Sequence, residues 1–499
     1  MNVANEKNFE NMLILSSGKL FGFCLSFMIP FFLSRWLTIE DYGTYKQLIL
    51  IWMIFMQVQN LGMDLGLFYF VKTYPKDSPI LSINVMIVNL FTTLMTVAVL
   101  GILSETLANV LHNPGLATYI PSFSLVLIFS IPSQHFENYL ISLGKIKWAF
   151  VLEGIHEIAK SCIILAGFLF FNSLRAVLLM LATLYMIKLT ILLWYNLRAF
   201  KKQSLDISSG VAFLMKQVLY GFPLGIARII SALIYFDKLI ISFMYSVTQF
   251  AIYSVGCFEI PFIRTMLNTM WELTSLEMVA AHNSKDSARL VSLMRDTMRK
   301  VSIIAIPIAI FGIIFAQEVI VGFFSSTYMA SVPYFKLFML VFLVNSFDCE
   351  LLFRVFKANK IFLKIQILNL ILTMMMMIIL GLTYGPLGAL VGKVISSAVS
   401  LAIMFKNVRR PLGVTLSEFV PIDIILWITV LCTVLGYSLL LVGNLAQLNG
   451  LTHLILSACL YFTTALLIFA SLGIISEMEK EYFKRKILLL NIFAKQRTS

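Results

Sequence analysis

Eight basic side chains of this sequence lie inside long apolar stretches, where a charged group is costly. Lys188 and Lys336 can reach toward the membrane surface, and Lys238 can pair with the adjacent Asp237. The candidates for a binding role are the other five, Lys19, Lys160, Arg228, Arg264 and Lys393. An ionised side chain within a lipid bilayer usually faces a protein interior or a water-filled cavity. Arginine offers a planar fork to phosphate oxygens, and lysine adds a mobile point charge. We therefore expect these residues to form an interior binding site for an anionic headgroup, and a pyrophosphate suits them better than a single carboxylate.

The five cations differ in the acids that lie near them in the sequence. Lys19, Arg228 and Lys393 have no acid three or four residues away, and small residues flank each of them. Small neighbours allow close helix approach or leave room for a cavity. Lys160 follows Glu157 by three residues, so neutralisation within the helix competes with a ligand role. For all of them, pairing with acids on other helices is the competing interpretation.

Two acids inside apolar stretches, Asp64 and Glu259, are candidates for ion coupling. Burial disfavours the charged form of a carboxyl group, so such a group can bind and release a proton during transport. Asp64 is the better candidate of the two. Pairing with a basic residue or capping of a helix end is the competing interpretation, and it is the one we favour for both.

No catalytic constellation or metal site is recognisable in the sequence. The five histidines are scattered without ligand spacing, the six cysteines all fall in apolar runs, and a glycine-rich phosphate loop of the Walker type is absent. We therefore expect no enzymatic activity, no cofactor and no metal.

The composition is that of a membrane protein. Of the 499 residues, 60% are hydrophobic and 13% are charged, and the mean hydropathy is +0.91. Apolar runs near twenty residues recur along the chain, which is typical of transmembrane helices. We predict an all-α polytopic membrane protein with about fourteen transmembrane helices. The predicted spans are 12–34, 46–70, 80–103, 118–142, 148–171, 175–197, 217–243, 250–272, 301–321, 333–355, 361–383, 386–405, 420–443 and 451–474.

Lysine and arginine concentrate in alternate loops. With a cytoplasmic amino terminus, 27 of the 38 basic residues fall in cytoplasmic segments, and only Arg35, Lys46 and Arg175 fall on the opposite face. This asymmetry predicts that both termini are cytoplasmic. The net charge of +13 thus reflects membrane orientation and not nucleic-acid binding. Two basic amphipathic segments, 273–300 and the tail from residue 476, are expected to lie in the headgroup plane against anionic lipids.

A shift of 208 residues indicates an internal duplication. It maps Tyr42-Gly43-Thr44-Tyr45 onto Phe250-Ala251-Ile252-Tyr253 and carries Lys19 to within one residue of Arg228. Parallel repeats that meet at a central site are a common plan of transporters.

Several short motifs carry a resemblance to a known family. They are Leu33-Ser34-Arg35-Trp36-Leu37, Glu40-Asp41-Tyr42-Gly43-Thr44-Tyr45, Asn60-Leu61-Gly62-Met63-Asp64-Leu65-Gly66, and Phe236-Asp237-Lys238 with Ala251-Ile252-Tyr253-Ser254-Val255. The chain resembles bacterial polysaccharide flippases, the O-antigen and capsule repeat-unit transporters of the multidrug/oligosaccharidyl-lipid/polysaccharide (MOP) superfamily. At Asp237-Lys238 the family more usually has an aspartate–arginine pair.

The resemblance implies two six-helix lobes facing each other in a V, followed by two extra helices. We expect an N-terminal lobe over 1–204, a C-terminal lobe over 205–410 that includes the cytoplasmic amphipathic helix 273–300, and two helices with a basic cytoplasmic tail over 411–499. It also implies that an undecaprenyl-pyrophosphate-linked oligosaccharide passes from the inner to the outer leaflet of the bacterial plasma membrane, for surface polysaccharide biosynthesis. The expected partners are this lipid-linked oligosaccharide, membrane lipids and other polysaccharide assembly proteins.

Two alternatives share the same superfamily. A peptidoglycan-precursor (lipid II) flippase would move a chemically similar substrate, and the sequence separates it poorly. A drug or organic-cation antiporter should have an anionic, aromatic-lined cavity, and the basic residues inside the spans that have no acid nearby in the sequence argue against it. A glycan polymerase or ligase would need a large outward loop, whereas every predicted outward loop is short.

Overall fold

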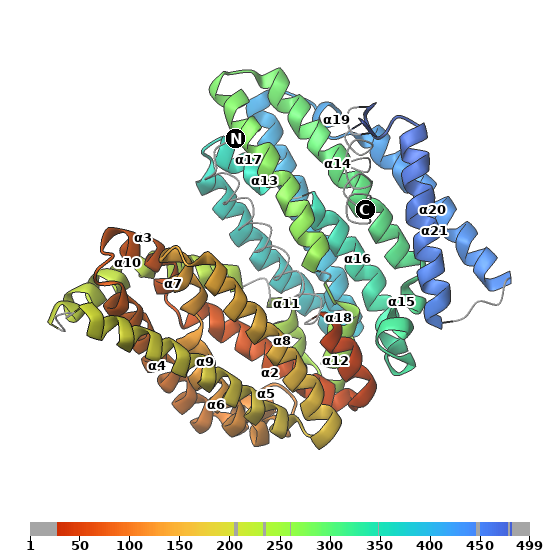
Figure 1. Ribbon diagram of the computed structural model, residues 1–499. Helices are drawn as coiled ribbons and strands as arrows, with labels where there is room; N and C mark the ends of the chain where they lie inside the picture. Colours follow the sequence, from red (N-terminus) through yellow and green to blue (C-terminus); the bar gives the residue numbers. More distant parts are fainter. Residues whose placement is uncertain are drawn as a thin grey trace, which may run out of the picture. The chain divides into compact units, whose positions relative to one another are not determined.

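Helices make up all the regular structure in the residues that the computed structural model describes (Figure 1). These are residues 27–203, 208–232, 236–259, 261–347, 349–445, 450–477 and 480–481. Ten helices within them are long and apolar enough to cross a membrane. The prediction of an all-α polytopic membrane protein is therefore confirmed. The ten are Ile39–Thr73, Ser78–Ile102, Leu116–Ser142, Ile146–Phe171, Leu174–Phe200, Ser287–Ile314, Ser326–Val355, Lys360–Leu412, Ile422–Gly443 and Gly450–Ser471.

The chain forms two compact units, Met1–Ser254 and Val255–Ser499. In the first, α6 packs on α4 and α9, and α10 packs on α2, α3 and α4. Its core gathers Leu67, Phe70, Leu81, Tyr139 and Leu192. The helices of the first unit are α2 (Ile39–Val58), α3 (Met63–Thr73), α4 (Ser78–Ile102), α5 (Ser104–Val110), α6 (Leu116–Ser133), α7 (Phe136–Ser142), α8 (Ile146–Phe171), α9 (Leu174–Gln203), α10 (Ser208–Ala232), α11 (Phe236–Met244) and the start of α12 (Val247–Gly256).

The second unit is built around α14, which packs on α13, α16 and α20. The last two long helices, α20 and α21, lie side by side (Figure 1). The helices of this unit are α13 (Pro261–Asn283), α14 (Ser287–Ile314), α15 (Ala316–Phe323), the 3-10 helix η2 (Ser326–Ser331), α16 (Val332–Ser346), α17 (Glu350–Val355), α18 (Asn359–Leu412), α19 (Leu416–Phe419), α20 (Ile422–Leu445) and α21 (Gly450–Ser471).

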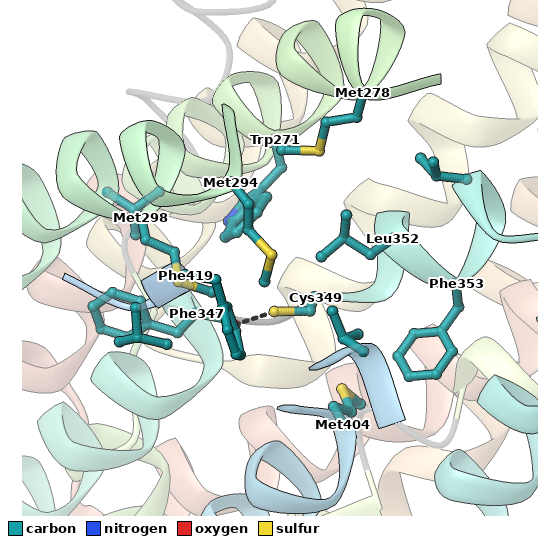
Figure 2. Close-up of a cluster of buried hydrophobic side chains, with 14 of the residues drawn as sticks. Trp271, Met278, Met294, Met298, Phe347, Cys349, Leu352, Phe353, Met404 and Phe419 are labelled. Carbon is teal, nitrogen blue, oxygen red and sulfur yellow. Dashed lines mark hydrogen bonds between the residues drawn. The ribbon is translucent and has the colours of Figure 1, made fainter. Parts of the chain in front are cut away.

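The segment predicted to be a surface amphipathic helix over 273–300 has a different structure. Helix α13 ends at Asn283, the chain turns, and the Asp286 side chain accepts a hydrogen bond from the Arg289 amide at the start of α14. Met294 and Met298 are fully buried and point into a cluster beside Phe419 (Figure 2). The apolar face therefore packs against other helices, and the prediction of a headgroup-plane helix was wrong for this segment.

The break predicted at residues 383–386 is confirmed within α18. Gly385 has φ +71° and ψ −166°, a conformation that favours glycine. After it the chain folds back on itself: a Cβ on Gly388 would lie 2.2 Å from the Leu380 carbonyl oxygen, and one on Gly392 would lie 2.6 Å from the Met376 carbonyl. Element α18 is thus a hairpin of two closely packed helices.

The predicted duplication has a structural counterpart at two helix starts. The Thr38 hydroxyl accepts from the Asp41 amide at the start of α2, and the Ser246 hydroxyl accepts from the Gln249 amide at the start of α12. These positions are related by the 208-residue shift. The two copies then diverge, because α2 runs on to Val58 whereas α12 ends at Gly256.

The compact units divide the chain later than the predicted lobes, whose boundary lies between residues 204 and 205. Residues 208–254 fall in the first unit because α10 packs on its helices. The predicted lobe boundary separates the two copies of the predicted repeat, and it stays a prediction.

Candidate functional site

A polar cavity of about 290 Å³ lies inside the first unit. Charged, amide and aromatic side chains line it, which is unusual for the interior of an apolar helix bundle. The lining residues are Trp52, Met56, Asp64, Ser130, Gln134, Glu137, Asn138, Glu153, His156, Glu157, Tyr185, Lys188 and Arg228.

A close contact between α3 and α10 positions two of these charges. Leu61 and Gly62 have φ of +48° and +73°, so the chain breaks sharply between α2 and α3. A Cβ on Gly62 would lie 2.5 Å from the Gly221 oxygen and 2.5 Å from the Gly225 nitrogen. Only glycine permits this backbone contact. Asp64 follows Gly62 by two residues and Arg228 follows Gly225 by three, so both side chains reach the crossing point.

Asp64 and Arg228 form an ion pair across this contact. Their Oδ2 and Nη2 atoms are 2.8 Å apart, and the two side chains are 3% and 20% exposed. The Leu65 amide donates to Asp64 Oδ1 at 2.8 Å, and Asn138 Nδ2 donates to Oδ2 at 3.2 Å. Arg228 is therefore not an unmatched cation. Sequence spacing missed the pair because the partners are on different helices.

Two lysines close to the cavity are also paired with carboxylates. Lys160 Nζ lies 2.6 Å from Glu157 Oε1, and Lys188 Nζ lies 2.7 Å from Glu153 Oε2. Lys160 is thus neutralised within its own helix, which is the alternative to a ligand role that the sequence had left open. Lys188 lines the cavity, although its position in the sequence suggested a side chain reaching toward the membrane surface.

Aromatic and amide groups complete the lining. Trp52 Nε1 donates to the Ser130 hydroxyl at 3.3 Å, and the His156 and Tyr185 rings lie 4.8 Å apart. His156 is 7% exposed, and its Nε2 atom has no hydrogen-bond partner among the described residues. The Gln134 Oε1 atom is likewise without a partner in the described part of the chain.

The charges of the cavity nearly balance. Four carboxylates line it, from Asp64, Glu137, Glu153 and Glu157, together with the cations Lys188 and Arg228, and Lys160 is bound to Glu157. The strongly cationic interior that the sequence predicted is therefore not present in this cavity. Because most of these groups are paired, a ligand that binds one of them must also disturb its partner.

The other predicted site residues lie elsewhere. Arg264 Nη1 is 3.1 Å from Glu259 Oε2, and both side chains are about half exposed, at 49% and 46%. Lys393 is half-buried in α18, directly after the tightly packed Gly392. Arg264, Glu259 and Lys393 all belong to the second unit. Lys19 lies outside the described residues, so the convergence of the five cations stays a prediction.

The long apolar helices of the described residues are those of a polytopic membrane protein, and a charged cavity lies inside the first unit. The chain belongs to the polysaccharide biosynthesis protein family, whose model matches residues 9–258. No curated protein sequence matches it.

Two solved structures show the same fold. One is "Lipid II flippase MurJ, inward closed conformation", with a TM-score of 0.66 and 13% sequence identity, covering 92% of this chain and 99% of that one. The other is an inward-facing multidrug resistance MATE family transporter of the MOP superfamily, with a TM-score of 0.56 and 13% identity, covering 81% of this chain and 98% of that one. The fold is thus shared over 92% of the chain with the lipid II flippase and over 81% with the MATE family transporter.

Proposed function

We propose that the chain is a flippase that moves undecaprenyl-pyrophosphate-linked oligosaccharide repeat units from the inner to the outer leaflet of the bacterial plasma membrane. The observation that carries this proposal is membership of the polysaccharide biosynthesis protein family. The likeness of the fold to a lipid II flippase over 92% of the chain supports it. The repeat unit would belong to a surface polysaccharide such as O-antigen or capsule.

Arg228 is the residue that we assign first to the anionic headgroup. It lines the cavity and is the more exposed member of its ion pair, so phosphate oxygens can approach its guanidinium group. Lys19, Lys393, Arg264 and Lys160 are assigned to the same role on the sequence argument. For Lys160 and Arg264 the ion pairs with Glu157 and Glu259 weaken that assignment.

The proposed topology has fourteen transmembrane helices in two six-helix lobes arranged as a V, with two additional helices and both termini in the cytoplasm. Ten described helices of membrane-spanning length support the count, and one of them is the α18 hairpin with two arms. The orientation rests on the distribution of lysine and arginine.

An organic-cation antiporter is the second candidate, because one observation favours it. The cavity combines four carboxylates with the aromatic side chains of Trp52 and Tyr185, which is the lining expected for a cationic ligand. A lipid II flippase remains the closest chemical alternative.

Reconstituted transport separates these candidates. Proteoliposomes containing the full chain receive undecaprenyl-pyrophosphate-linked N-acetylglucosamine on one side, and an impermeant reagent measures its arrival on the other. We expect translocation of this probe, no proton-driven uptake of ethidium, and loss of translocation in Arg228→Gln. Ethidium transport without lipid translocation would reject the flippase, and a preference for lipid II over the probe would favour the peptidoglycan precursor.

A further inference from the structure

Asp64 depends on Arg228 for the compensation of its charge. Its side chain is 3% exposed, less than any other charged side chain in the ion pairs of the cavity. The other hydrogen bonds to its carboxylate come from two neutral donors, the Leu65 amide and the Asn138 side chain. A buried carboxylate that loses its counter-ion is strongly destabilised unless it takes up a proton.

An anion that binds to Arg228 weakens this compensation of the Asp64 charge. The ion pair with Asp64 uses one guanidinium nitrogen of Arg228, and the arginine is the more exposed partner, so its other N–H donors can serve phosphate oxygens. If the phosphate displaces Asp64, the carboxylate loses its counter-ion. If both anions share the guanidinium group, like-charge repulsion acts on Asp64 instead. Both geometries favour the neutral carboxylic acid.

We propose that Asp64 takes up a proton from water when a pyrophosphate headgroup binds to Arg228, so that headgroup and proton occupy the first unit together. This inference rests on the proposed function, because it takes the pyrophosphate of the lipid-linked substrate as the anion. The step is a proton transfer without any change of oxidation state: an O–H bond of a hydronium ion breaks, an O–H bond to a carboxylate oxygen of Asp64 forms, water is released, and the guanidinium group turns to phosphate.

Other titratable groups face Asp64 across the cavity. The two lysines are held by Glu153 and Glu157, so they do not replace Arg228 as the counter-ion of Asp64. Helix α4, which also packs on α3, has no titratable side chain. The facing groups are Glu137 on α7, Glu153, His156 and Glu157 on α8, Tyr185 and Lys188 on α9, and Arg228 on α10.

The sign of this linkage has a consequence for transport. Binding of headgroup and of proton favour each other, and such coupling is reciprocal, so acidification should tighten headgroup binding. An exchanger of headgroup against protons needs the opposite sign, because its two ligands must exclude each other. The geometry therefore assigns Asp64 to a proton that is bound with the headgroup, and not to proton exchange.

The test measures protons taken up per bound anion. Farnesyl pyrophosphate, a soluble probe with the same headgroup, is titrated calorimetrically into the full chain in nanodiscs, in two buffers of different ionisation enthalpy. The matched control is Asp423→Asn, since Asp423 also pairs with an arginine, Arg295, at 3.0 Å but is 65% exposed. For each bound probe molecule, we expect wild type and Asp423→Asn to take up one proton more than Asp64→Asn does.

The pH dependence of the affinity for farnesyl pyrophosphate provides a second test. Between about pH 8 and pH 7 wild type should gain up to about tenfold in affinity relative to Asp64→Asn, the limit for one linked proton. Equal proton uptake in wild type and Asp64→Asn would overturn the proposal. So would equal probe binding by wild type and Arg228→Gln, whatever the flipping assay shows. If Asp64→Asn does not fold, the wild type alone decides: a protonated-carboxyl band must rise in its infrared difference spectrum on probe binding, and its absence is contrary evidence.

Discussion

At the scale of single residues, the ion pair between Asp64 and Arg228 combines structural and functional demands. Its partners lie on different helices, and the pair lines the cavity. Removing one partner of a buried pair costs about 3–5 kcal/mol because the other charge is left uncompensated. A loss of transport in a single variant would therefore not by itself prove a ligand role for Arg228.

Charge reversal combined with a swap separates the two roles. Arg228→Glu places two carboxylates together, and we expect flipping to be lost. The double variant Asp64→Arg/Arg228→Asp restores an ion pair, so thermal stability in detergent should recover toward wild type while flipping stays absent. Recovery of flipping in the swapped protein would show that the pair is only structural.

A conservative series tests the geometry of the guanidinium group. Arg228→Lys keeps the charge but loses the planar fork, so flipping of the undecaprenyl-pyrophosphate probe should fall about tenfold or more. Lys19→Arg keeps both charge and donors and should retain part of the activity. Proteoliposome rates at equal protein content measure both, and an Arg228→Lys rate equal to wild type would contradict the role of the fork.

Sequence spacing can indicate an ion pair only where its partners are local. Glu157 and Lys160 are three residues apart on one helix, so their pairing could be named as the alternative to a ligand role for Lys160, and the structure contains that pair. The Asp64–Arg228 pair spans more than 160 residues of sequence, and its partners meet only because α3 and α10 cross at glycines. Helical spacing alone contains no information about such a contact.

At the scale of elements, glycines decide where helices touch. The small residues beside Arg228 and Lys393 suggested close helix approach. Gly225 indeed packs against the backbone of Leu61 in the turn before α3, and Gly392 packs against the backbone of Met376 in the other arm of α18. The amphipathic pattern over 273–300 was equally clear but ambiguous, since an apolar stripe can face lipid or other helices. In the structure Met294 and Met298 pack on the rest of the second unit, so this apolar stripe faces other helices.

Substitution at the α3–α10 contact should disturb the site without touching a charge. In Gly62→Ala the new Cβ would collide with the Gly221 and Gly225 backbone, at a residue whose φ is +73°. We expect a loss of ~1–3 kcal/mol in stability and reduced flipping, because the crossing that presents Asp64 to Arg228 must open. Gly154→Ala on α8 is the control, since a Cβ there meets nothing within 4 Å. Thermal unfolding in detergent measures both, and equal melting temperatures would count against this role of the contact.

At the scale of the whole molecule, the structure fixes which chain segments lie at opposite ends of the same helices. Lys72 lies at the end of α3 and His112 follows α4 and α5, so α4 separates them by the thickness of a membrane. Likewise Arg295 and Lys300 lie in the first half of α14, whereas Thr327 in η2 follows its far end. From the distribution of basic residues we predict which end of each helix faces the cytoplasm.

Reporter fusions test this orientation directly. Fusions at His112, Thr327 and Gln447 should report the outer face, and fusions at Gln203 and Lys406 the inner face. The reason is that α4 and α14 are each long enough to span a bilayer, with 25 and 28 residues, and each carries its basic flank on one side. Alkaline phosphatase activity together with cysteine accessibility in intact cells measures each site. An inner-face signal at Thr327 is incompatible with cytoplasmic Arg295 and Lys300, so it would reject the proposed topology of the second unit. The topology of the first unit is tested separately by the fusion at His112.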